Sequence, residues 1–421
     1  MEQPDLSTTS RTSALDGAKE DFPLFRSAGN EGLIYLDNAA ITQVPRSVID
    51  AVTEHLSSKN ANVHRGNYRL SRDATDALEA VRKSTARFIG AASPDEIVFT
   101  SGTTDGLNQL VRGLEHAIGP RNAVLTTAME HHSNLVPWQE LCRRTGADLV
   151  VCPTDEQGRI DESVFADLLA SNEVAVAAFT HTSNVTGCVN PVSRLAAQAH
   201  DAGALTVVDG AQAMRQNGID MQALGCDFFA FSGHKMCAPT GIGVLWGRGD
   251  AFERLEPSRY GGGMVDQVTE AGASFSKAPY GFEGGTPNIA GIIGFGTAIE
   301  YLEAHDRNAI AQHESALTQR LCESLSALNG VTVLGEPDER HGAVSVVVER
   351  LHPYDIGCIM DKKNVAVRTG HHCAQPYIAR LGADSALRFS PAFYNDEADI
   401  DAGIAAFAET IELLQRIGTR S

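Results

Sequence analysis

The sequence predicts an α/β protein with two domains: a large three-layer domain built on a mainly parallel sheet, and a smaller α+β domain. Three observations support this prediction. The chain has 421 residues, more than one hydrophobic core usually serves. From about residue 96, continuously apolar segments alternate with amphipathic patterns, as in parallel sheets covered by helices on both faces. After about residue 301 the chain becomes richer in helical patterns, with separate short strands.

The domain boundaries follow these changes in pattern. The start of the chain contains no apolar run and carries several acidic side chains, so we expect a flexible tail there. The expected segments are a tail over 1–18, a segment packing with the small domain over 19–34, the large domain over 35–301 and the small domain over 302–421.

Short apolar runs predict the strands of the large domain. They are expected at 96–100, 123–127, 148–152, 174–179, 205–208, 227–231 and 243–246. One helix between them is predicted by the apolar positions Leu107, Leu110, Val111, Leu114 and Ile118. Thr103 or Thr104 can cap this helix and Gly119 can end it. Another helix is expected to begin at Asn190-Pro191.

The small domain is expected to contain strands at 331–334, 343–348, 365–368 and 386–389. A final helix carries one apolar stripe, formed by Ile400, Ile404, Phe407, Ile411 and Leu414. The glycine-rich stretches 261–263 and 281–285 are interpreted as mobile or close-packed loops.

The charge balance restricts the partners of this protein. Lys and Arg number 34 against 53 Asp and Glu, and the net charge of −19 argues against nucleic acid or an anionic membrane surface. The longest apolar stretches are too short to span a bilayer, and the N-terminus lacks the features of a targeting signal. The eight cysteines form no CxxC pair and no metal-ligand spacing, so we expect no metal site and a reducing, cytoplasmic location.

Two apolar strands end in an acid and in a lysine. Asp209 ends the run that begins at Leu205, and Lys235 follows the polar turn after the next apolar run. The two residues are one strand–connection–strand step apart, which places a carboxylate and an amine at the same edge of the sheet. Pyridoxal phosphate (PLP) needs this pair: an amine to hold its aldehyde, and an acid to keep its ring nitrogen protonated.

Polar residues follow two further strands of the large domain. Thr103 and Thr104 lie where a strand joins a helix, so they can bind a phosphate at the helix N-terminus or merely cap the helix. His131 follows the strand ending at Thr127 and is expected to lie over a planar cofactor, the alternative being a hydrogen-bonded loop histidine. The adjacent His132 is interpreted as structural.

The small domain contributes a thiol and an arginine. Cys373 follows Gly370 and two histidines, so it belongs to a loop in which it can be exposed and reactive, or remain a passive surface cysteine. Arg388 lies within an apolar strand and needs a buried anion, either the carboxylate of a substrate or a structural partner.

From about residue 22 onward the chain resembles the group II cysteine desulfurases of the SufS/CsdA type. These belong to the class V aminotransferase group of fold-type I PLP enzymes. The segments that carry the resemblance are YLDNAA (35–40), NVHRG (62–66), SGTTDG (101–106), MEHHSNLVPWQ (129–139), HTSNVTG (181–187), VDGAQA (208–213), FSGHKM (231–236), PTGIGVL (239–245), FEGGTPN (282–288) and VAVRTGHHCAQP (365–376).

The resemblance implies a role for each matching residue. Lys235 holds PLP and moves the substrate α-proton, while Asp209 faces the ring nitrogen. Cys373 attacks the substrate sulfur and becomes a persulfide, which leaves L-alanine. The remaining cofactor contacts implied are His131 stacked on the ring, Gln212 near its phenolic oxygen, and Thr103, Thr104, Ser232 and His234 on the phosphate, with Thr286 from the other subunit of a homodimer. The implied substrate contacts are Asn184, Arg368 and Arg388, the last on the carboxylate.

The sequence departs from the family pattern at a few positions. Cys237 and Ala238 replace an aromatic residue and a glycine, and Phe389 begins an altered stretch after Arg388. In the branch of the family that hands sulfur to a zinc-bound scaffold partner, a histidine tends to occupy the position of Tyr354. Its absence favours a SufE-like sulfur acceptor in iron–sulfur cluster assembly. The alternatives are a selenocysteine lyase, a specialised C–S lyase, and a non-catalytic scaffold that retains only the fold.

Overall fold

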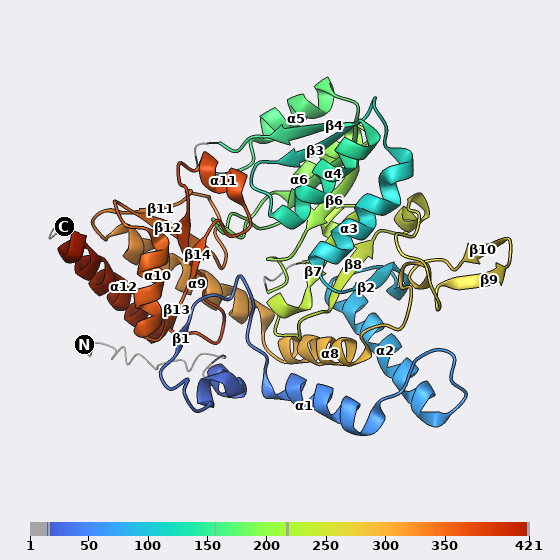
Figure 1. Ribbon diagram of the computed structural model, residues 1–421, viewed down its shortest axis with the longest axis horizontal. Coiled ribbons are helices and arrows are strands. Elements are labelled where there is room, and N and C mark those ends of the chain that lie inside the picture. Colours follow the sequence, from blue (N-terminus) through green and yellow to red (C-terminus); the bar gives the residue numbers. More distant parts are fainter. Residues whose placement is uncertain (1–14, 16, 156, 216–218, 419–421) are drawn as a thin grey trace, which may run out of the picture.

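A seven-stranded sheet forms the centre of the molecule, in a computed structural model that describes residues 15, 17–155, 157–215 and 219–418 (Figure 1). Its strand order is β2-β8-β7-β6-β5-β3-β4. Strands β7, β6, β5, β3 and β4 run parallel, whereas β8 is antiparallel to both of its neighbours. The predicted mainly parallel sheet is therefore confirmed.

The strand bounds match the sequence prediction to within one residue at each end. They are β2 Ile97–Thr100, β3 Ala123–Thr127, β4 Asp148–Cys152, β5 Val174–Thr180, β6 Leu205–Asp209, β7 Phe228–Ser232 and β8 Gly243–Gly247. In β2, β3, β7 and β8 every residue is buried, because helices cover both faces of the sheet.

Two separate apolar clusters make the sheet the middle of three layers. One face packs against α3 Thr103–Leu114 and α4 Val136–Thr145. The other packs against α2 Arg69–Phe88, α5 Glu162–Ser171, α6 Val192–Asp201 and α8 Ile289–Glu303. Two shorter helices, α1 Arg46–Glu54 and α7 Met221–Leu224, complete this part of the chain.

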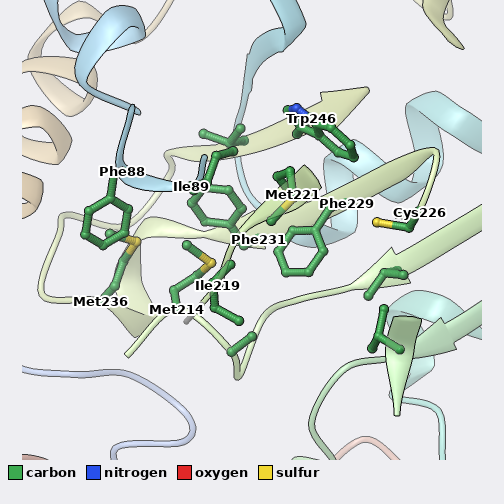
Figure 2. Close-up of a cluster of buried hydrophobic side chains, with 14 of the residues drawn as sticks. Phe88, Ile89, Met214, Ile219, Met221, Cys226, Phe229, Phe231, Met236 and Trp246 are labelled. Carbon is green, nitrogen blue, oxygen red and sulfur yellow. The ribbon is translucent and has the colours of Figure 1, made fainter. Parts of the chain in front are cut away.

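The second of these clusters fixes the loops that follow β6 and β7. Figure 2 shows Phe229 and Phe231 of β7 in a cluster with Met214 and Met236. Both methionines are fully buried, with at most 1% exposed, and each follows a strand end by a few residues. Burial of such side chains stabilises the fold by about 1.5–3 kcal/mol each, and here it also anchors the segments next to Asp209 and Lys235.

The C-terminal part is built on a four-stranded antiparallel sheet of order β11-β12-β15-β14. The strands are β11 Val331–Val333, β12 Val344–Val348, β14 Arg368–Gly370 and β15 Ala386–Phe389. Its helices are α9 Arg307–Ser326, α10 Pro353–Lys362, α11 Gln375–Arg380 and α12 Glu397–Gly418. In Figure 1 this sheet lies beside the central sheet, on the left of the view.

The N-terminal segment contacts both parts of the molecule. The Lys19 amine pairs with Asp399 of α12 at 2.8 Å, and the Phe22 ring lies 5.9 Å from that of Tyr301 in α8. The strand β1 Ile34–Tyr35 pairs in parallel with β13 Val365–Ala366. Leu36, expected in the large domain, is fully buried in the apolar core of the C-terminal part.

Several expectations about local structure are wrong. Leu15 and Ala18, assigned to a flexible tail, are buried, while residues 1–14 and 16 of that tail lie outside the described residues. Neither Thr103 nor Thr104 caps α3, because the N-cap is Gly102. The strand expected at 365–368 divides into β13 and β14, which belong to different sheets.

A hairpin that the sequence does not indicate follows the first glycine-rich stretch. It consists of β9 Val265–Thr269 and β10 Gly272–Phe275, and it projects from the rest of the molecule at the right of Figure 1. No helix in the described part of the chain combines the length and apolarity needed to cross a membrane.

Candidate active site

One cavity of about 190 Å³ opens at the carboxyl ends of the central parallel strands. The ends of β5, β6 and β7 supply Thr180, Asp209 and Ser232 to its wall. Twelve predicted site residues line it: Thr103, Thr104, His131, Asn184, Asp209, Gln212, Ser232, His234, Lys235, Arg368, Cys373 and Arg388. The thirteenth, Thr286, does not. The position agrees with the general rule that open α/β sheets bind ligands beyond their carboxyl edge.

Asp209 and Lys235 extend from neighbouring strands into this cavity. Asp209 is the last residue of β6, and its Oδ1 accepts a hydrogen bond from the backbone N–H of Ala211 at 2.9 Å. The following residue must be small, since a Cβ at Gly210 would lie 1.9 Å from the Phe229 ring. Burial raises the pKa of the Asp209 carboxyl, and the charge of Lys235 opposes that rise.

The Lys235 side chain borders the open cavity, but protein atoms surround its amine. This burial lowers the pKa of Lys235 to about 8, although the Asp209 carboxylate acts in the opposite direction. A larger fraction of the amine is therefore uncharged at neutral pH than in an ordinary lysine, and the uncharged form is the nucleophile.

The N-terminus of α3 forms one end of the cavity. The helix has no side-chain cap, and its N-cap Gly102 has a φ of 144°, where a Cβ would lie only 3.2 Å from the Ser232 hydroxyl. The backbone N–H of Thr103 donates to the Ser232 hydroxyl at 2.8 Å, and the Thr103 and Ser232 hydroxyls are hydrogen-bonded at 2.7 Å. A helix N-terminus beside several hydroxyls is suited to bind a phosphate.

A second group of polar side chains lies beside that helix end. The Thr104 and Ser133 hydroxyls are 2.7 Å apart, and the Ser133 hydroxyl lies 3.0 Å from Nδ1 of His131. Burial and the nearby Lys235 charge lower the pKa of His131 to about 3. A neutral imidazole in the cavity wall can stack on a flat ring without adding a charge.

Gln212 and His234 flank the pair of acid and amine. The amide nitrogen of Gln212 donates to the carbonyl oxygen of Ala39 at 2.7 Å, so this side chain is fixed to the N-terminal segment. Burial, together with the Lys235 charge, lowers the pKa of His234 to about 4. Both residues line the cavity as the sequence predicts.

Cys373 lies on an exposed loop that reaches the cavity from the C-terminal part. It and His372 are consecutive residues in the left-handed region, with φ of 55° and 51°. Such backbone costs about 1–2 kcal/mol per non-glycine residue. The Asn184 side chain donates to the carbonyl oxygen of His372 at 2.7 Å and helps to hold the loop in this conformation.

Arg388 is the most deeply buried cation in the cavity wall. Only 2% of its side chain is exposed; its Nη1 donates to the carbonyl oxygen of Asn184 at 2.9 Å, and its Nη2 donates to Asp37 Oδ1 at 3.0 Å. Its Nε has no hydrogen-bond partner among the described residues. Arg368 is more open, with 42% of its side chain exposed.

Several further residues of this site are not predicted from the sequence. Ser133, Thr180 and His372 also line the cavity, and Asp37 lies behind its two arginines. His372 is 4% exposed, and burial lowers its pKa to about 3; its ring approaches the Ala386 backbone, but neither ring nitrogen makes a hydrogen bond of normal geometry. The histidine pair preceding Cys373 was a usable signal for His372, whereas no local pattern identifies Asp37.

Thr286 lies in a different hollow of the same chain. That hollow is lined by Asn62, Val63, His64, Arg65, Gly262, Gly263, Gly285, Thr286 and Pro287. Thr286 therefore contributes nothing to the cavity of its own chain. Among the described residues there is no cluster of side chains suited to a metal ion.

Residues 34–402 match the family model for class V aminotransferases. The probable cysteine desulfurase of Halalkalibacterium halodurans is 43% identical over 397 residues, which cover 94% of this chain and 97% of that protein. The cysteine desulfurase of Pectobacterium atrosepticum is 41% identical over 403 residues, covering 95% and 98%.

Two solved structures have the same fold. The apo cysteine desulfurase from Thermococcus onnurineus NA1 superposes with a TM-score of 0.90 at 37% identity, covering 94% of this chain and 98% of that one. The cysteine desulfurase CsdA from Escherichia coli gives a TM-score of 0.88 at 33% identity, covering 95% and 98%. The protein thus has the fold-type I architecture of PLP enzymes and belongs to the class V aminotransferase family. Within that family, its relatives at about 40% identity are named cysteine desulfurases.

Proposed function

We propose that this protein is a PLP-dependent cysteine desulfurase that converts L-cysteine to L-alanine and carries the released sulfur on Cys373. The observation that supports this most strongly is the shared cavity, where the pair of Asp209 and Lys235 lies with Cys373 and Arg388. An amine and an acid suit the coenzyme, a thiol suits the sulfur, and an arginine suits a carboxylate. The desulfurase relatives support the same assignment.

The residues of the cavity fit PLP. The N-terminus of α3, with the hydroxyls of Thr103 and Ser232, would hold the phosphate. The buried carboxylate of Asp209 would face the ring nitrogen, and Lys235 would carry the aldehyde carbon. When bound, PLP withdraws electrons from the substrate Cα, which makes its proton acidic enough to be removed.

The side chains of the protein then bind the substrate and move its proton. Arg388 would hold the α-carboxylate. Its side chain is buried, its planar guanidinium can donate two parallel hydrogen bonds, and its Nε has no hydrogen-bond partner among the described residues. The amine of Lys235 would act as the base for the substrate α-proton, and its lowered pKa of about 8 suits proton transfer in both directions near neutral pH.

Cys373 completes the reaction by taking the sulfur. Its thiolate forms a bond to the substrate sulfur while the bond between that sulfur and the substrate Cβ breaks. The electron pair of the broken bond stays with the carbon fragment, which gains protons and leaves as L-alanine. Cys373 is left as a persulfide, so no external oxidant is needed.

Substitution of Cys373 by alanine tests this function. Alanine formation from L-cysteine should fall by at least about 100-fold, since an essential nucleophile is removed. Cofactor absorbance should be unchanged. Cys358→Ala is the matched control, because Cys358 is also an exposed free thiol but lies on α10 outside the cavity. Alanine release at the wild-type rate without Cys373, especially from selenocysteine, would instead identify a selenocysteine lyase.

The unusual residues near Lys235 give little support to a specialised C–S lyase. Cys237, Ala238 and Phe389 have no more than 1% of their surface exposed, and none of them lines the cavity. They can affect the packing behind the site but do not offer a new contact to the substrate. The intact acid, amine and thiol argue likewise against a scaffold without activity.

A homodimer is part of the proposal. Thr286 is outside the cavity of its own chain, where a partner subunit could use it for the phosphate. Large apolar side chains are exposed on the nearby 260–280 segment: Tyr260, Val268, Phe275 and Tyr280. Sedimentation should therefore give the mass of two chains, and a monomer that binds PLP and turns over normally would contradict this.

The group II assignment and the sulfur acceptor are also proposals. The motifs around Lys235 and Cys373 support a SufS/CsdA-type enzyme that serves iron–sulfur cluster assembly in the cytoplasm. Tyr354, 64% exposed on α10, offers no imidazole to a zinc-bound acceptor, which favours a SufE-like protein with an acceptor thiol. Sulfur transfer from the labelled enzyme to such a thiol, in the absence of zinc, would test this choice.

A further inference from the structure

A buried carboxyl group lies behind the wall of the cavity. Glu130 is only 1% exposed and does not line the cavity, whereas the next residue in the sequence, His131, does. The Glu130 side chain lies between the ends of strands β3 and β5, where it contacts Thr127 and Thr180. A carboxyl group buried in this way is tolerated only when its oxygens are hydrogen-bonded.

Three hydrogen bonds hold the Glu130 carboxyl group. Its Oε1 lies 2.5 Å from the Thr127 hydroxyl and accepts from the backbone N–H of Thr180 at 3.0 Å. Its Oε2 accepts from the side-chain amide of Asn134 at 2.6 Å. Thr127 and Asn134 lie on either side of His131 in the sequence, so Glu130 closes the loop that carries this histidine. Thr180, which itself lines the cavity, attaches the same loop to β5.

The three hydrogen-bond partners of Glu130 are all uncharged groups. Burial raises the pKa of Glu130 to about 8; the Asp209 charge acts in the same direction, and the three hydrogen bonds act against the rise. The positive charge of Lys235 acts on Asp209. The histidines of the two contacting segments, His131 and His181, are neutral, because burial lowers their pKa values to about 3 and about 4. Glu130 is therefore mainly an uncharged acid at neutral pH.

The contacts of Glu130 suit a protonated carboxyl group. A proton on Oε1 can be donated to the Thr127 hydroxyl oxygen, while Oε2 remains free to accept from the Asn134 amide. A carboxylate here would be a second negative charge beside Asp209, and like charges that share a site raise one another's pKa. Asp209 would then be protonated more easily and would hold the proton of a coenzyme ring nitrogen less well.

We propose that Glu130 is a positioning residue for the coenzyme: as an uncharged acid it holds the His131 ring in place and adds no second negative charge beside Asp209. This inference rests on the proposed function, because it takes PLP as the molecule that His131 and Asp209 contact. Glu130 does not line the cavity, so it acts on PLP through the histidine loop.

Infrared spectroscopy tests the protonation of Glu130 without any turnover. Wild-type protein near neutral pH, both stripped of PLP and loaded with it, should show the carbonyl band of a buried protonated carboxylic acid. Glu130→Gln should lose this band in both states. If Glu130→Gln removed only bands of an ionised carboxylate from the wild-type spectrum, the assignment of an uncharged acid would be overturned.

The affinity of the stripped protein for PLP tests the positioning role. Glu130→Met keeps the approximate shape of the side chain and removes its hydrogen bonds, so the dissociation constant for PLP should rise about tenfold. His131→Ala should also raise it about tenfold, since it removes the ring that would stack on PLP. The double variant Glu130→Met/His131→Ala should bind PLP within about threefold of His131→Ala alone, because both residues act through one contact.

Glu96→Gln is the matched control for a purely structural effect. Glu96 is a buried carboxyl group, 5% exposed, that accepts a hydrogen bond from Nε1 of Trp246 at 3.0 Å and lies just before β2, outside the cavity. Its substitution should leave the affinity for PLP unchanged. Equal weakening in Glu96→Gln and Glu130→Met would overturn the positioning role, and so would additive effects of Glu130→Met and His131→Ala.

Glu130→Asp replaces Glu130→Met in these measurements if the methionine variant does not fold. Its side chain is one carbon shorter and cannot reach Thr127, Asn134 and Thr180 together, so PLP binding should weaken in the same way. Failure of the proposed function would be distinct from these outcomes. It would appear in the wild-type protein, which would then bind no PLP, or would bind PLP and form no alanine from L-cysteine.

Discussion

The backbone N–H of His132 donates a hydrogen bond to the carbonyl oxygen of Cys373, with 2.7 Å between the two atoms. In return, Nε2 of His132 accepts a hydrogen bond from the backbone N–H of Gln375 at 3.3 Å. The loop with the proposed nucleophile is thus attached to the loop with His131, although the two loops belong to different parts of the fold. The histidine interpreted as structural from the sequence connects the thiol to the cofactor end of the cavity.

His132→Ala should slow sulfur transfer to Cys373 without loss of bound PLP. The variant keeps the hydrogen bond from its backbone N–H to Cys373 and removes the imidazole that accepts from Gln375. Loss of that hydrogen bond should cost about 1 kcal/mol, or roughly a fivefold decrease in rate. Rapid-mixing measurement of alanine formation checks this. His371→Ala, an exposed residue of the same loop, should match wild type; equal slowing in both variants would contradict a specific role for His132.

The pKa of Lys235 predicts how the protein takes up its cofactor. Only the neutral amine reacts with an aldehyde, so uptake of PLP by stripped protein should accelerate about tenfold per pH unit in the acid range. It should level off above pH 8, because the pKa is lowered to about 8. In Asp209→Asn the midpoint should move to lower pH, since the Asp209 charge raises the pKa of Lys235. A midpoint near the ordinary lysine value of 10.5 in wild type would refute the prediction.

Arg388→Lys should weaken binding of ligands that carry a carboxylate. A lysine cannot reproduce the forked contact, so the dissociation constant for L-alanine should rise about 10- to 100-fold. Ethylamine lacks the carboxylate and serves as the control ligand, with no more than about a threefold change expected. Absorbance titration of the PLP-loaded protein measures both, and parallel weakening of the two ligands would indicate general damage to the site.

A buried ion pair between the two parts of the fold predicts the pH dependence of stability. Glu314 of α9 is fully buried, 2.8 Å from Nη1 of Arg215 and 3.1 Å from Nε2 of His341. The pKa of Glu314 is lowered despite burial, which opposes the shift, because Arg215 and His341 favour its charged form. A carboxyl group whose pKa is lower in the folded than in the unfolded state stabilises the fold at pH values above its unfolded pKa, near 4.5. This contribution to stability is lost as the pH falls through the pKa of the folded state.

Glu314→Gln should therefore reduce the free energy of unfolding at pH 7 by about 3–5 kcal/mol, since it leaves Arg215 buried without its anion. The difference from wild type should shrink as the pH falls below 4.5. Urea denaturation at a series of pH values measures both effects. A difference that is constant with pH would show that charge at Glu314 does not contribute.

Much of the fold and of the site follows from patterns that are local in sequence. Asp209 and Lys235 each end an apolar strand, and adjacent parallel strands bring their ends together, so their proximity could be predicted. The same reasoning placed His131 and Thr103 at that edge. The roles of the matching residues came from the family resemblance, and their chemistry stays a prediction until tested.

Other features depend on contacts between distant segments and could not be predicted. Asp37 meets its arginines only because the N-terminal segment passes beside β15. Leu15 and Ala18 are two apolar residues within a polar stretch of sequence, yet tertiary packing buries them. The N-cap of α3 was predicted at the wrong residue. Gly102 is required there because the backbone approaches the Ser232 side chain closely, and the sequence of the helix does not indicate this contact.

Transfer of sulfur to Cys373 from L-cysteine bound at Lys235 is the step on which the proposed function depends. Mass spectrometry of the intact, PLP-loaded protein after addition of L-cysteine without reductant detects this transfer. We expect an added mass of one sulfur atom per chain, located on the peptide that contains Cys373, together with one equivalent of L-alanine. Alanine formation with Cys373 unmodified, or sulfur found on another cysteine in a Cys373→Ala variant with full activity, would contradict it.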